Sequence, residues 1–434
     1  MSKQNIEFKD SGIPWIGEIP KHWEISKIKY VANLFTGNSI SDSQKDNFTN
    51  SENSLPYIAT KDIELDTNLV NYKNGMYIPK LNSSFKIAPK NSILLCIEGG
   101  SAGRKISFIN KDVCFVNKLC CFVAKPDFLK KFLYYYCQNP SFISEFKLNL
   151  IGLIGGVSIN SIKNFKIPLP PLNEQKEIAE FLDKKCEIID KRLSNLERKI
   201  KSLKEYKKSL ISECVTKGLN PKNIEFKDSG IPWIGQIPKH WEIKKVKYCF
   251  YIISGSGFEI KSQGLESGDY PVVKASDISK AGHYLYTSSN YINSKEQKNL
   301  GFKIIPKGSI LMAKIGEAIK KNNRSIAMVD CCLDNNCQGL VPKDIKSDFA
   351  FYLFNCINSQ WFDNSGTIPC INNVKLLNFK IPYPSIDEQK KIAEFLDKKC
   401  EKIDRLNENY TKQIAALKEY KKSLIYECVT GKNI

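Results

Sequence analysis

The sequence predicts an α+β fold: two mixed α/β domains joined by two long antiparallel coiled-coil helices, with an internal pseudo-two-fold duplication. Three observations lead to this prediction. Two segments of the first half recur in the second half, the stretches between them differ, and each copy of the later segment has apolar residues at heptad spacing.

The duplication has two parts. Residues 5–30, called repeat A, recur as residues 223–248 with three substitutions, and residues 164–216, called repeat B, recur without gaps as residues 378–430. The first insert (31–163) and the second insert (249–377) have diverged, and they keep only short islands such as Pro-Lys-x-Ser-Ile-Leu at 89–94 and 306–311. One scaffold therefore carries two different inserts, as a protein that recognises two unlike half-targets requires.

Both inserts are predicted to be small mixed α/β domains. Short runs of β-branched or aromatic residues alternate with turn residues, and a helix is expected near the end of each insert. Strands are expected at 56–59, 92–97, 121–123, 270–273 and 309–312, and helices near 128–146 and 348–362. The predicted domains are 1–170 and 219–384, and the predicted helices occupy 171–218 and 385–434.

Repeat B predicts a long helix that begins with Asn173 as its N-cap and ends near Gly218, and its copy is expected to run from Asp387 to Gly431. Apolar residues recur every seven positions, which is typical of a coiled-coil seam. The seam residues are Leu182, Ile189, Leu196, Leu203 and Leu210 in the first helix, and Leu396, Ile403, Leu417 and Leu424 in the second. Asn407 occupies an a position, where asparagine fixes register, so we expect the helices to pair with each other. The alternative is a seam packed on a globular domain.

The paired helices are long enough to act as a ruler. At 1.5 Å per residue, ~42 helical residues span ~63 Å, nearly two turns of B-form DNA. We therefore expect the pair to fix the distance between two contacts with DNA.

The chain is strongly basic. Its 65 Lys and Arg exceed its 46 Asp and Glu, giving a formal charge of +19, and this balance favours a polyanionic partner. A lysine-rich composition inherited from an AT-biased genome is the alternative explanation. No apolar run is long enough to cross a bilayer and no secretory signal is visible, so we expect a soluble, cytoplasmic protein without a membrane partner.

Fifteen cysteines lie mostly in apolar stretches, which predicts buried reduced thiols. The pairs Cys120-Cys121 and Cys331-Cys332 lack CxxC spacing and a neighbouring histidine, so no metal site is expected.

Loops that combine glycine, small polar and basic residues are candidate DNA contacts. Lys and Arg bind phosphates, while Arg, Asn and Ser can also read base edges. The candidates are Lys61, Ser101, Arg104, Lys105 and Lys118 in the first half, and Lys274, Ser276, Lys314, Lys320, Lys321, Arg324 and Asn335 in the second. Ordinary solvated turns are the alternative.

We expect no catalytic residue in the chain. His22 and His240 occupy matching positions of repeat A without a nearby nucleophile, so a packing role is expected for both. The sequence Asn139-Pro140-Ser141-Phe142 is only faintly similar to the Asn-Pro-Pro-Phe motif of adenine methyltransferases and is interpreted as a helix kink. No GxxxxGK[ST] loop for ATP occurs in the sequence.

Several motifs together resemble the specificity subunits of type I restriction-modification systems. They are Ile-Pro-x-x-Trp-Glu (19–24 and 237–242), Asp62 and Asp277 at strand ends, the Pro-Lys-x-Ser-Ile-Leu islands, and Ile-Pro-Leu-Pro-Pro-Leu-Asn-Glu-Gln-Lys-Glu-Ile-Ala (167–179) before a long helix. The resemblance covers nearly the whole chain. Its departures are modest: residues 384–387 differ from residues 170–173, and Tyr410 interrupts the seam.

The resemblance implies a non-catalytic subunit for host defence and DNA methylation. It implies two target recognition domains that each read half of a bipartite double-stranded DNA target, and two helices that set the spacer and dock modification (methyltransferase) subunits, two of them. Restriction subunits would complete the nuclease. No cofactor is expected on this chain, because S-adenosylmethionine, ATP and magnesium would be bound by the partner subunits.

Two alternatives belong to other classes of protein. One is a single-chain enzyme that fuses DNA recognition with methyltransferase or nuclease activity. The other is a basic coiled-coil adaptor that reads no sequence, although an adaptor gives no reason for two separately diverged inserts.

Overall fold

A long helix follows each insert, as the heptad pattern predicts. In the computed structural model, α5 runs from Leu172 to Lys217 and α11 from Ile386 to Val429. The expectation that Asn173 caps α5 is wrong. The helix begins two residues earlier than an Asn173 cap implies, because the carbonyl of Pro171 already accepts the hydrogen bond of Gln175 N at 3.0 Å.

The structure describes residues 7–152, 155–364 and 366–433, and it forms two compact units. Unit 1 contains residues up to Arg198 together with those from Tyr410 onward, and unit 2 contains Lys199–Asn409, so each long helix contributes a part to each unit. The shorter elements of unit 1 are β1 (Phe8–Asp10), β2 (Glu18–Pro20), β3 (Glu24–Lys27), α1 (Ile28–Val31), β4 (Ala32–Thr36), η1 (Asp42–Phe48), β5 (Ser54–Ile58), η2 (Thr60–Asp62), β6 (Tyr77–Pro79), β7 (Ile87–Ala88), β8 (Ile93–Cys96), β9 (Ile106–Phe108), β10 (Val113–Phe115), β11 (Leu119–Ala124), α2 (Lys130–Gln138), α3 (Pro140–Leu148), α4 (Ile159–Lys163) and β12 (Lys166–Leu169).

Unit 2 repeats much of this order. Its shorter elements are η3 (Pro221–Asn223), β13 (Phe226–Asp228), β14 (Gln236–Pro238), β15 (Glu242–Lys245), α6 (Val246–Cys249), β16 (Phe250–Ser254), η4 (Ile260–Ser262), β17 (Tyr270–Val273), α7 (Ala275–Ala281), β18 (Tyr284–Leu285), β19 (Tyr291–Ile292), α8 (Ser294–Asn299), β20 (Ile310–Ala313), η5 (Glu317–Lys321), β21 (Arg324–Ala327), β22 (Cys332–Leu333), β23 (Cys337–Pro342), α9 (Ser347–Cys356), η6 (Ser359–Phe362), α10 (Asn373–Asn378) and β24 (Lys380–Tyr383). The mixed α/β character predicted for both inserts is confirmed.

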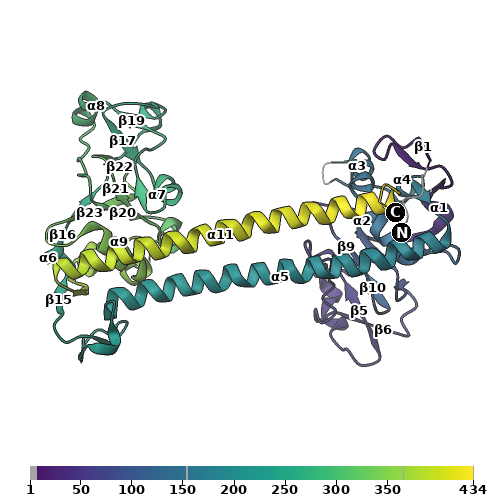
Figure 1. The fold of residues 1–434 in the computed structure, drawn as a ribbon, viewed down its shortest axis with the longest axis horizontal. Coiled ribbons are helices and arrows are strands. Elements are labelled where there is room, and N and C mark those ends of the chain that lie inside the picture. The colour runs from purple at the N-terminus through teal and green to yellow at the C-terminus, as the bar shows by residue number, and fades with distance from the viewer. Residues whose placement is uncertain (1–6, 153–154, 365, 434) are drawn as a thin grey trace. The chain divides into compact units, whose positions relative to one another are not determined.

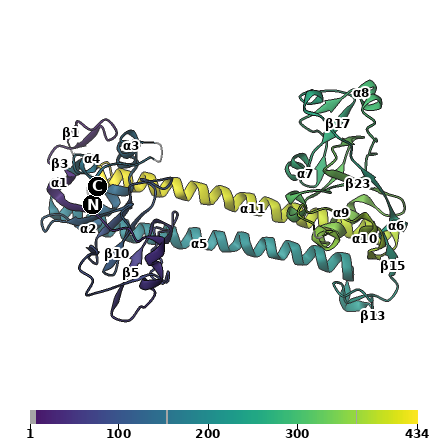
Figure 2. The ribbon, with the colours of Figure 1, turned by 180° about the vertical axis from the view of Figure 1, so that it is seen from behind.

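Each insert contains two larger sheets. In unit 1 these have the orders β4-β11-β8-β9 and β6-β5-β10-β7, and in unit 2 they have the orders β16-β23-β20-β21-β18 and β19-β17-β22. The second sheet of each unit holds a parallel pair, β5 with β10 and β17 with β22. In Figure 1 this second sheet lies farther from the long helices than the first, and Figure 2 shows the same for β17 compared with β23 in unit 2.

The long helices complete the core of each unit. The apolar cluster of unit 1 joins Leu182 and Ile189 of α5 with Leu424 of α11 and with residues of the first insert. The cluster of unit 2 joins Cys214 of α5 with Leu396 of α11 and with residues of the second insert. Burial of these shared faces stabilises the pairing, because apolar area removed from water contributes roughly 25 cal/mol per Å².

An ion pair joins the two long helices in each unit, and each unit contains the first part of one helix and the last part of the other. In unit 1 the Lys421 ammonium of α11 lies 2.6 Å from the Asp190 carboxylate of α5. In unit 2 the Lys207 ammonium of α5 lies 2.6 Å from the Asp404 carboxylate of α11. The start of one helix therefore accompanies the end of the other, as expected.

The seam positions differ in burial. Leu182, Ile189, Leu196, Leu396, Ile403 and Leu424 are buried, whereas Leu203, Leu210, Asn407 and Leu417 are half-buried. In α5 the half-buried positions lie between the buried Leu196 and Cys214, and in α11 they lie between the buried Ile403 and Leu424. The pairing therefore combines apolar contacts with ion pairs.

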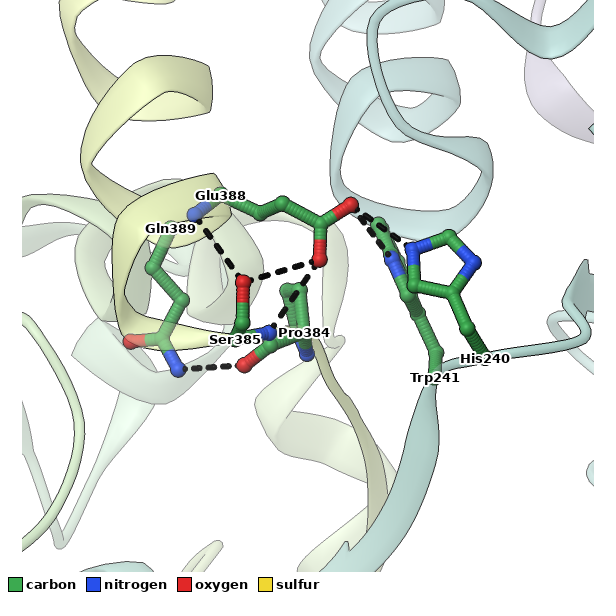
Figure 3. A network of polar contacts seen from close by, with 6 residues as sticks. All are labelled: His240, Trp241, Pro384, Ser385, Glu388 and Gln389. Carbon is green, nitrogen blue, oxygen red and sulfur yellow. Dashed lines mark hydrogen bonds and ion pairs between the residues drawn. The ribbon is translucent and has the colours of Figure 1, made fainter.

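Repeat A is fastened to repeat B by one carboxylate in each unit. In unit 2 the Glu388 carboxylate accepts hydrogen bonds from His240 Nε2 at 2.8 Å, Trp241 Nε1 at 3.3 Å and Ser385 Oγ at 3.0 Å (Figure 3). In unit 1 Glu174 accepts from His22 and Trp23 in the same way. The side chains of His22 and His240 are 49% and 51% exposed, so the two histidines link the repeats through hydrogen bonds and are not packed in the core.

The same tryptophans also contact the end of the other long helix. Gly431 lies just beyond the end of α11 in unit 1, and a Cβ added there would lie 3.1 Å from the ring of Trp23. Gly218 directly follows α5 in unit 2, and a Cβ added there would lie 3.5 Å from the ring of Trp241. Each tryptophan is therefore held between the start of one long helix and the end of the other.

Replacing Glu388 by alanine is expected to destabilise unit 2 by about 1–3 kcal/mol, because Trp241 Nε1 would lose its acceptor. Burial alone would raise the pKa of Glu388, but hydrogen bonds from His240, Trp241 and Ser385 together hold the pKa below its usual value. The lowered pKa stabilises the folded state at pH values above the ordinary pKa of glutamate. The difference between E388A and the natural chain should therefore shrink as pH falls through the lowered pKa.

Urea unfolding followed by tryptophan fluorescence measures this difference. The matched control is E394A, because the Glu394 side chain is exposed and its ion pair with Lys390 is 4.0 Å long. The control should change stability by about 0.5 kcal/mol or less. Equal effects of the two substitutions would contradict the fastening role of Glu388.

All fifteen cysteines are free thiols, and all but Cys356 and Cys370 are buried, which confirms the sequence prediction. Burial raises the pKa of Cys121 to about 12 and that of Cys114 to about 11, so both stay protonated at neutral pH. None of the helices in the described ranges combines the length and apolar character needed to cross a bilayer.

Candidate nucleic-acid interface

In unit 1, loops that follow several strands meet at one edge of the insert. We call residues 59–62, 97–105 and 116–118 the first rim. Lys105 Nζ donates a hydrogen bond to Thr60 O at 2.9 Å, and Ile97 N donates to Lys118 O at 3.0 Å. Three segments distant in sequence are therefore fixed against one another.

The second insert forms an equivalent edge, the second rim, from residues 274–277, 314–323 and 334–336. Lys314 N donates to Asn336 O at 2.7 Å, in the position of the bond between Ile97 and Lys118. Asp334 N donates to Val273 O at 3.1 Å and joins the end of β17 to the same edge.

The two rims share their backbone turns. Asp62 accepts a hydrogen bond from Ala59 N, and Asp277 accepts one from Lys274 N, both at 2.8 Å. Both aspartates are 6% exposed, so they hold the turns and do not face a ligand. Gly99 and Gly316 both have a φ of +87°, a conformation that residues with a Cβ rarely adopt.

The structure brings the candidate residues of the first half together on the first rim. Lys61, Arg104 and Lys118 are exposed, and Ser101 and Lys105 are half-buried. Four cationic side chains at one edge can bind the phosphate backbone of a nucleic acid. Whether any of them contacts bases stays a prediction.

Most candidates of the second half lie on the second rim. Ser276, Lys320, Lys321 and Asn335 are exposed, whereas Lys274 and Lys314 are half-buried. The ammonium groups of Lys274 and Lys320 have partners, because Lys274 donates to Gln263 Oε1 at 2.6 Å and Lys320 pairs with Glu317 at 2.8 Å. Both rims therefore carry four cationic side chains, and in each rim two of these have a partner.

The structure contradicts the expectation that Arg324 faces DNA. Arg324 is 4% exposed and begins β21, where its guanidinium donates to Asn322 Oδ1, to Asn323 O and to Ser359 Oγ. Burial lowers the pKa of Arg324 to about 10. In unit 2 the strand pairing places Arg324 opposite Met312. In the equivalent strands of unit 1, Ile106 lies opposite Leu95, so Arg324 occupies the position that a core residue has in the first insert.

Sequence reasoning assigned no contact to two rim residues, Glu98 and Asn336, although Glu98 lies in a loop that it proposed to face DNA. The Glu98 carboxylate lies 3.8 Å from the Lys118 ammonium, and its side chain is 42% exposed. Asn336 is exposed beside Asn335. A signal existed for both, since Glu98 opens the glycine-rich loop that was singled out and Asn336 directly precedes an apolar strand.

Asn139, from the sequence that is faintly similar to a methyltransferase motif, and His283 have structural roles. Asn139 is buried and caps α3, since its side chain accepts from Ser141 N at 2.6 Å and Phe142 N at 3.2 Å. It therefore marks the junction of α2 and α3, as the helix-kink interpretation predicts. His283 is stacked between the rings of Tyr284 and Phe351, with centroid distances of 4.0 and 3.8 Å, and burial lowers its pKa. In the described parts of the chain, no three His, Cys, Asp or Glu residues are grouped to hold a metal ion.

Comparison with known families gives two matches within the chain. The family described as "Type I restriction modification DNA specificity domain" matches residues 20–203 and again residues 238–416. Each match covers one insert, together with parts of the repeats on either side.

Individual relatives of similar length are known. The chain is 27% identical to the type I restriction enzyme MjaVIII specificity subunit of Methanocaldococcus jannaschii, over 95% of the chain and 93% of that protein. It is 34% identical to the MjaIX specificity subunit of the same organism, over 44% of the chain and 43% of that protein.

Solved structures share the fold. A chain from a study of complex assembly and conformational transition of the type I R-M system superposes with a TM-score of 0.73 at 15% identity, covering 96% of this chain and 99% of that chain. The HsdS subunit from Thermoanaerobacter tengcongensis superposes with a TM-score of 0.53 at 16% identity, covering 96% and 98%. The fold of this chain is therefore shared with solved structures over nearly its whole length.

Proposed function

Since the chain belongs to the family of type I restriction-modification DNA specificity domains, we propose that it is the DNA-recognition subunit of a type I restriction-modification complex. Each insert, with its rim, reads one half of a bipartite target in double-stranded DNA. The chain itself is not an enzyme.

The observation that carries this proposal is the pair of matched rims. Their backbone turns are held by equivalent hydrogen bonds from Ala59 and Lys274, whereas most of the side chains that they expose differ. Two readers built on one backbone can address two different sequences in the same geometry, because phosphate contacts set position and side chains on base edges set specificity.

Modification subunits dock on the repeats, and we propose two of them. Repeat A exposes the same aromatic and basic pair twice: Lys29 lies 5.1 Å from the ring of Tyr30, and Lys247 lies 5.2 Å from the ring of Tyr248. The tyrosines are 63% and 62% exposed. Exposed aromatic residues are enriched in protein interfaces, and a surface that occurs twice supports two copies of one partner.

The cofactors belong to the partners in this proposal. Modification subunits bind S-adenosylmethionine, and restriction subunits bind ATP and magnesium to complete the nuclease. The duplicated long helices set the length of the spacer between the two half-targets.

Methylome sequencing tests the proposal. Cells that express the chain with its modification subunits are expected to carry adenine methylation at one two-part motif, and cells without the chain are expected to lose that motif alone. The purified chain incubated with labelled methyl donor and DNA should incorporate no label. Incorporation by the chain alone would support a fused enzyme, and an unchanged methylome would support an adaptor that reads no sequence.

A further inference from the structure

Three positions on the rims have matched backbone and unlike side chains. The first pair is Lys61 and Ser276, which each precede the aspartate of an equivalent turn. Both are exposed. The aspartate turn is equivalent, although η2 ends at Asp62 whereas α7 continues to Ala281. The two rims therefore present unlike side chains at the same point of one turn.

The second pair is Glu98 and Ile315. Each directly precedes a glycine with a φ of +87°, Gly99 or Gly316. Glu98 forms an isolated β-bridge with Gly156, and Ile315 forms one with Cys370. Glu98 is 42% exposed as a side chain, and Ile315 is half-buried.

The third pair is Lys118 and Asn336. The carbonyl of Lys118 accepts from Ile97 N at 3.0 Å, and the carbonyl of Asn336 accepts from Lys314 N at 2.7 Å. Both side chains are exposed beside the second pair, and the Lys118 ammonium lies 3.8 Å from the Glu98 carboxylate.

The side chains at the three positions differ systematically in chemistry. The first rim presents Lys, Glu and Lys, which are all charged, whereas the second presents Ser, Ile and Asn, which are all uncharged. In the major groove lysine pairs with the O6 and N7 acceptors of guanine, and glutamate accepts from the N4 amine of cytosine. Asparagine instead pairs with N6 and N7 of adenine, an apolar side chain contacts the thymine methyl group, and serine serves either base pair.

We propose that these three positions determine base preference, with the first rim selecting G·C pairs through Lys61, Glu98 and Lys118 and the second selecting A·T pairs through Ile315 and Asn336. The inference rests on the proposed function and deepens it, since it assigns a base composition to each half-target. Ser276 contributes a hydrogen bond without choosing between the two kinds of base pair.

The test exchanges the chemistry of the first rim while the second rim stays intact. The triple variant K61S/E98I/K118N carries the side chains of the second rim on the backbone of the first. The complex with modification subunits is assayed for its methylated motif and for binding to duplexes that differ at single base pairs. We expect the preference at the contacted positions of one half-target to change from G·C to A·T by about 10- to 100-fold, with the other half-target unchanged.

The control variant is K80N, which produces the same change in net charge. Lys80 is exposed and follows β6, whose residue Pro79 pairs with Ser54 at the start of β5, whereas the first rim follows the end of β5. K80N should leave both half-targets unchanged.

The possible outcomes separate the inference from the proposed function. If the triple variant keeps the natural motif and its discrimination, the inference is overturned while the proposed function stands. If the natural chain directs methylation to no two-part motif, the proposed function itself fails. If the triple variant no longer binds either half, the single variants E98Q and K118Q decide: each should weaken discrimination at a G·C pair, and unchanged discrimination in both overturns the inference.

Discussion

Replacing residues 31–163 by the corresponding insert of another family member is expected to change one half of the DNA target completely and to leave the other half unchanged. The first rim lies within this insert, and the second rim lies wholly within residues 249–377. Methylation of the original target should fall by about 10³-fold or more, which is the usual gap between specific and non-specific binding. Methylome sequencing gives the new motif directly.

The reciprocal replacement of residues 249–377 is the matched control and should change only the other half. A change in both halves, or in neither, would contradict modular recognition. Because repeats A and B stay intact in both chimeras, Glu174 and Glu388 keep their partners in repeat A and the scaffold should fold.

Inserting seven residues into both long helices is expected to lengthen the spacer between the two half-targets by about three base pairs. Seven helical residues add ~10.5 Å, and neighbouring base pairs are ~3.4 Å apart along B-form DNA. The insertion points are after Arg198 in α5 and after Asn409 in α11, where both helices pass from one unit into the other. A full heptad keeps the apolar seam in register.

Insertion into α5 alone is the control. The insertion lies between Asp190 and Lys207, so it increases the distance between these two residues along α5 but leaves their partners in α11 unchanged. The ion pairs Asp190–Lys421 and Lys207–Asp404 can then no longer form at the same time. This variant should lose methylation activity. A double insertion that leaves the spacer unchanged would show that the helices do not measure the target.

The sequence was sufficient to predict the architecture because its signals are periodic or repeated. The heptad spacing in repeat B predicts both long helices to within a few residues of their observed ends, and the duplication predicts the equivalence of the two halves. The predicted start of α5 is wrong by two residues, because Pro171 supplies the first acceptor and Asn173 is not needed as a cap.

The candidate interface was predicted less completely because loop side chains depend on contacts that are distant in sequence. Arg324 stands next to lysines and asparagines in the sequence, yet β21 pairs it with Met312 inside a sheet. Glu98 was passed over among basic neighbours, although its position beside Lys118 depends on the bond from Ile97 N to a carbonyl more than twenty residues later. Neither relation leaves a local pattern.

The packing of Trp23 has a consequence for biosynthesis. Its carboxylate partner belongs to α5, but the apolar cluster around it also needs Leu424, Ile425 and Val429. The first recognition domain therefore cannot close its core while the ribosome is still translating the second. A nascent chain that ends before Leu424 leaves this part of the apolar cluster exposed to water.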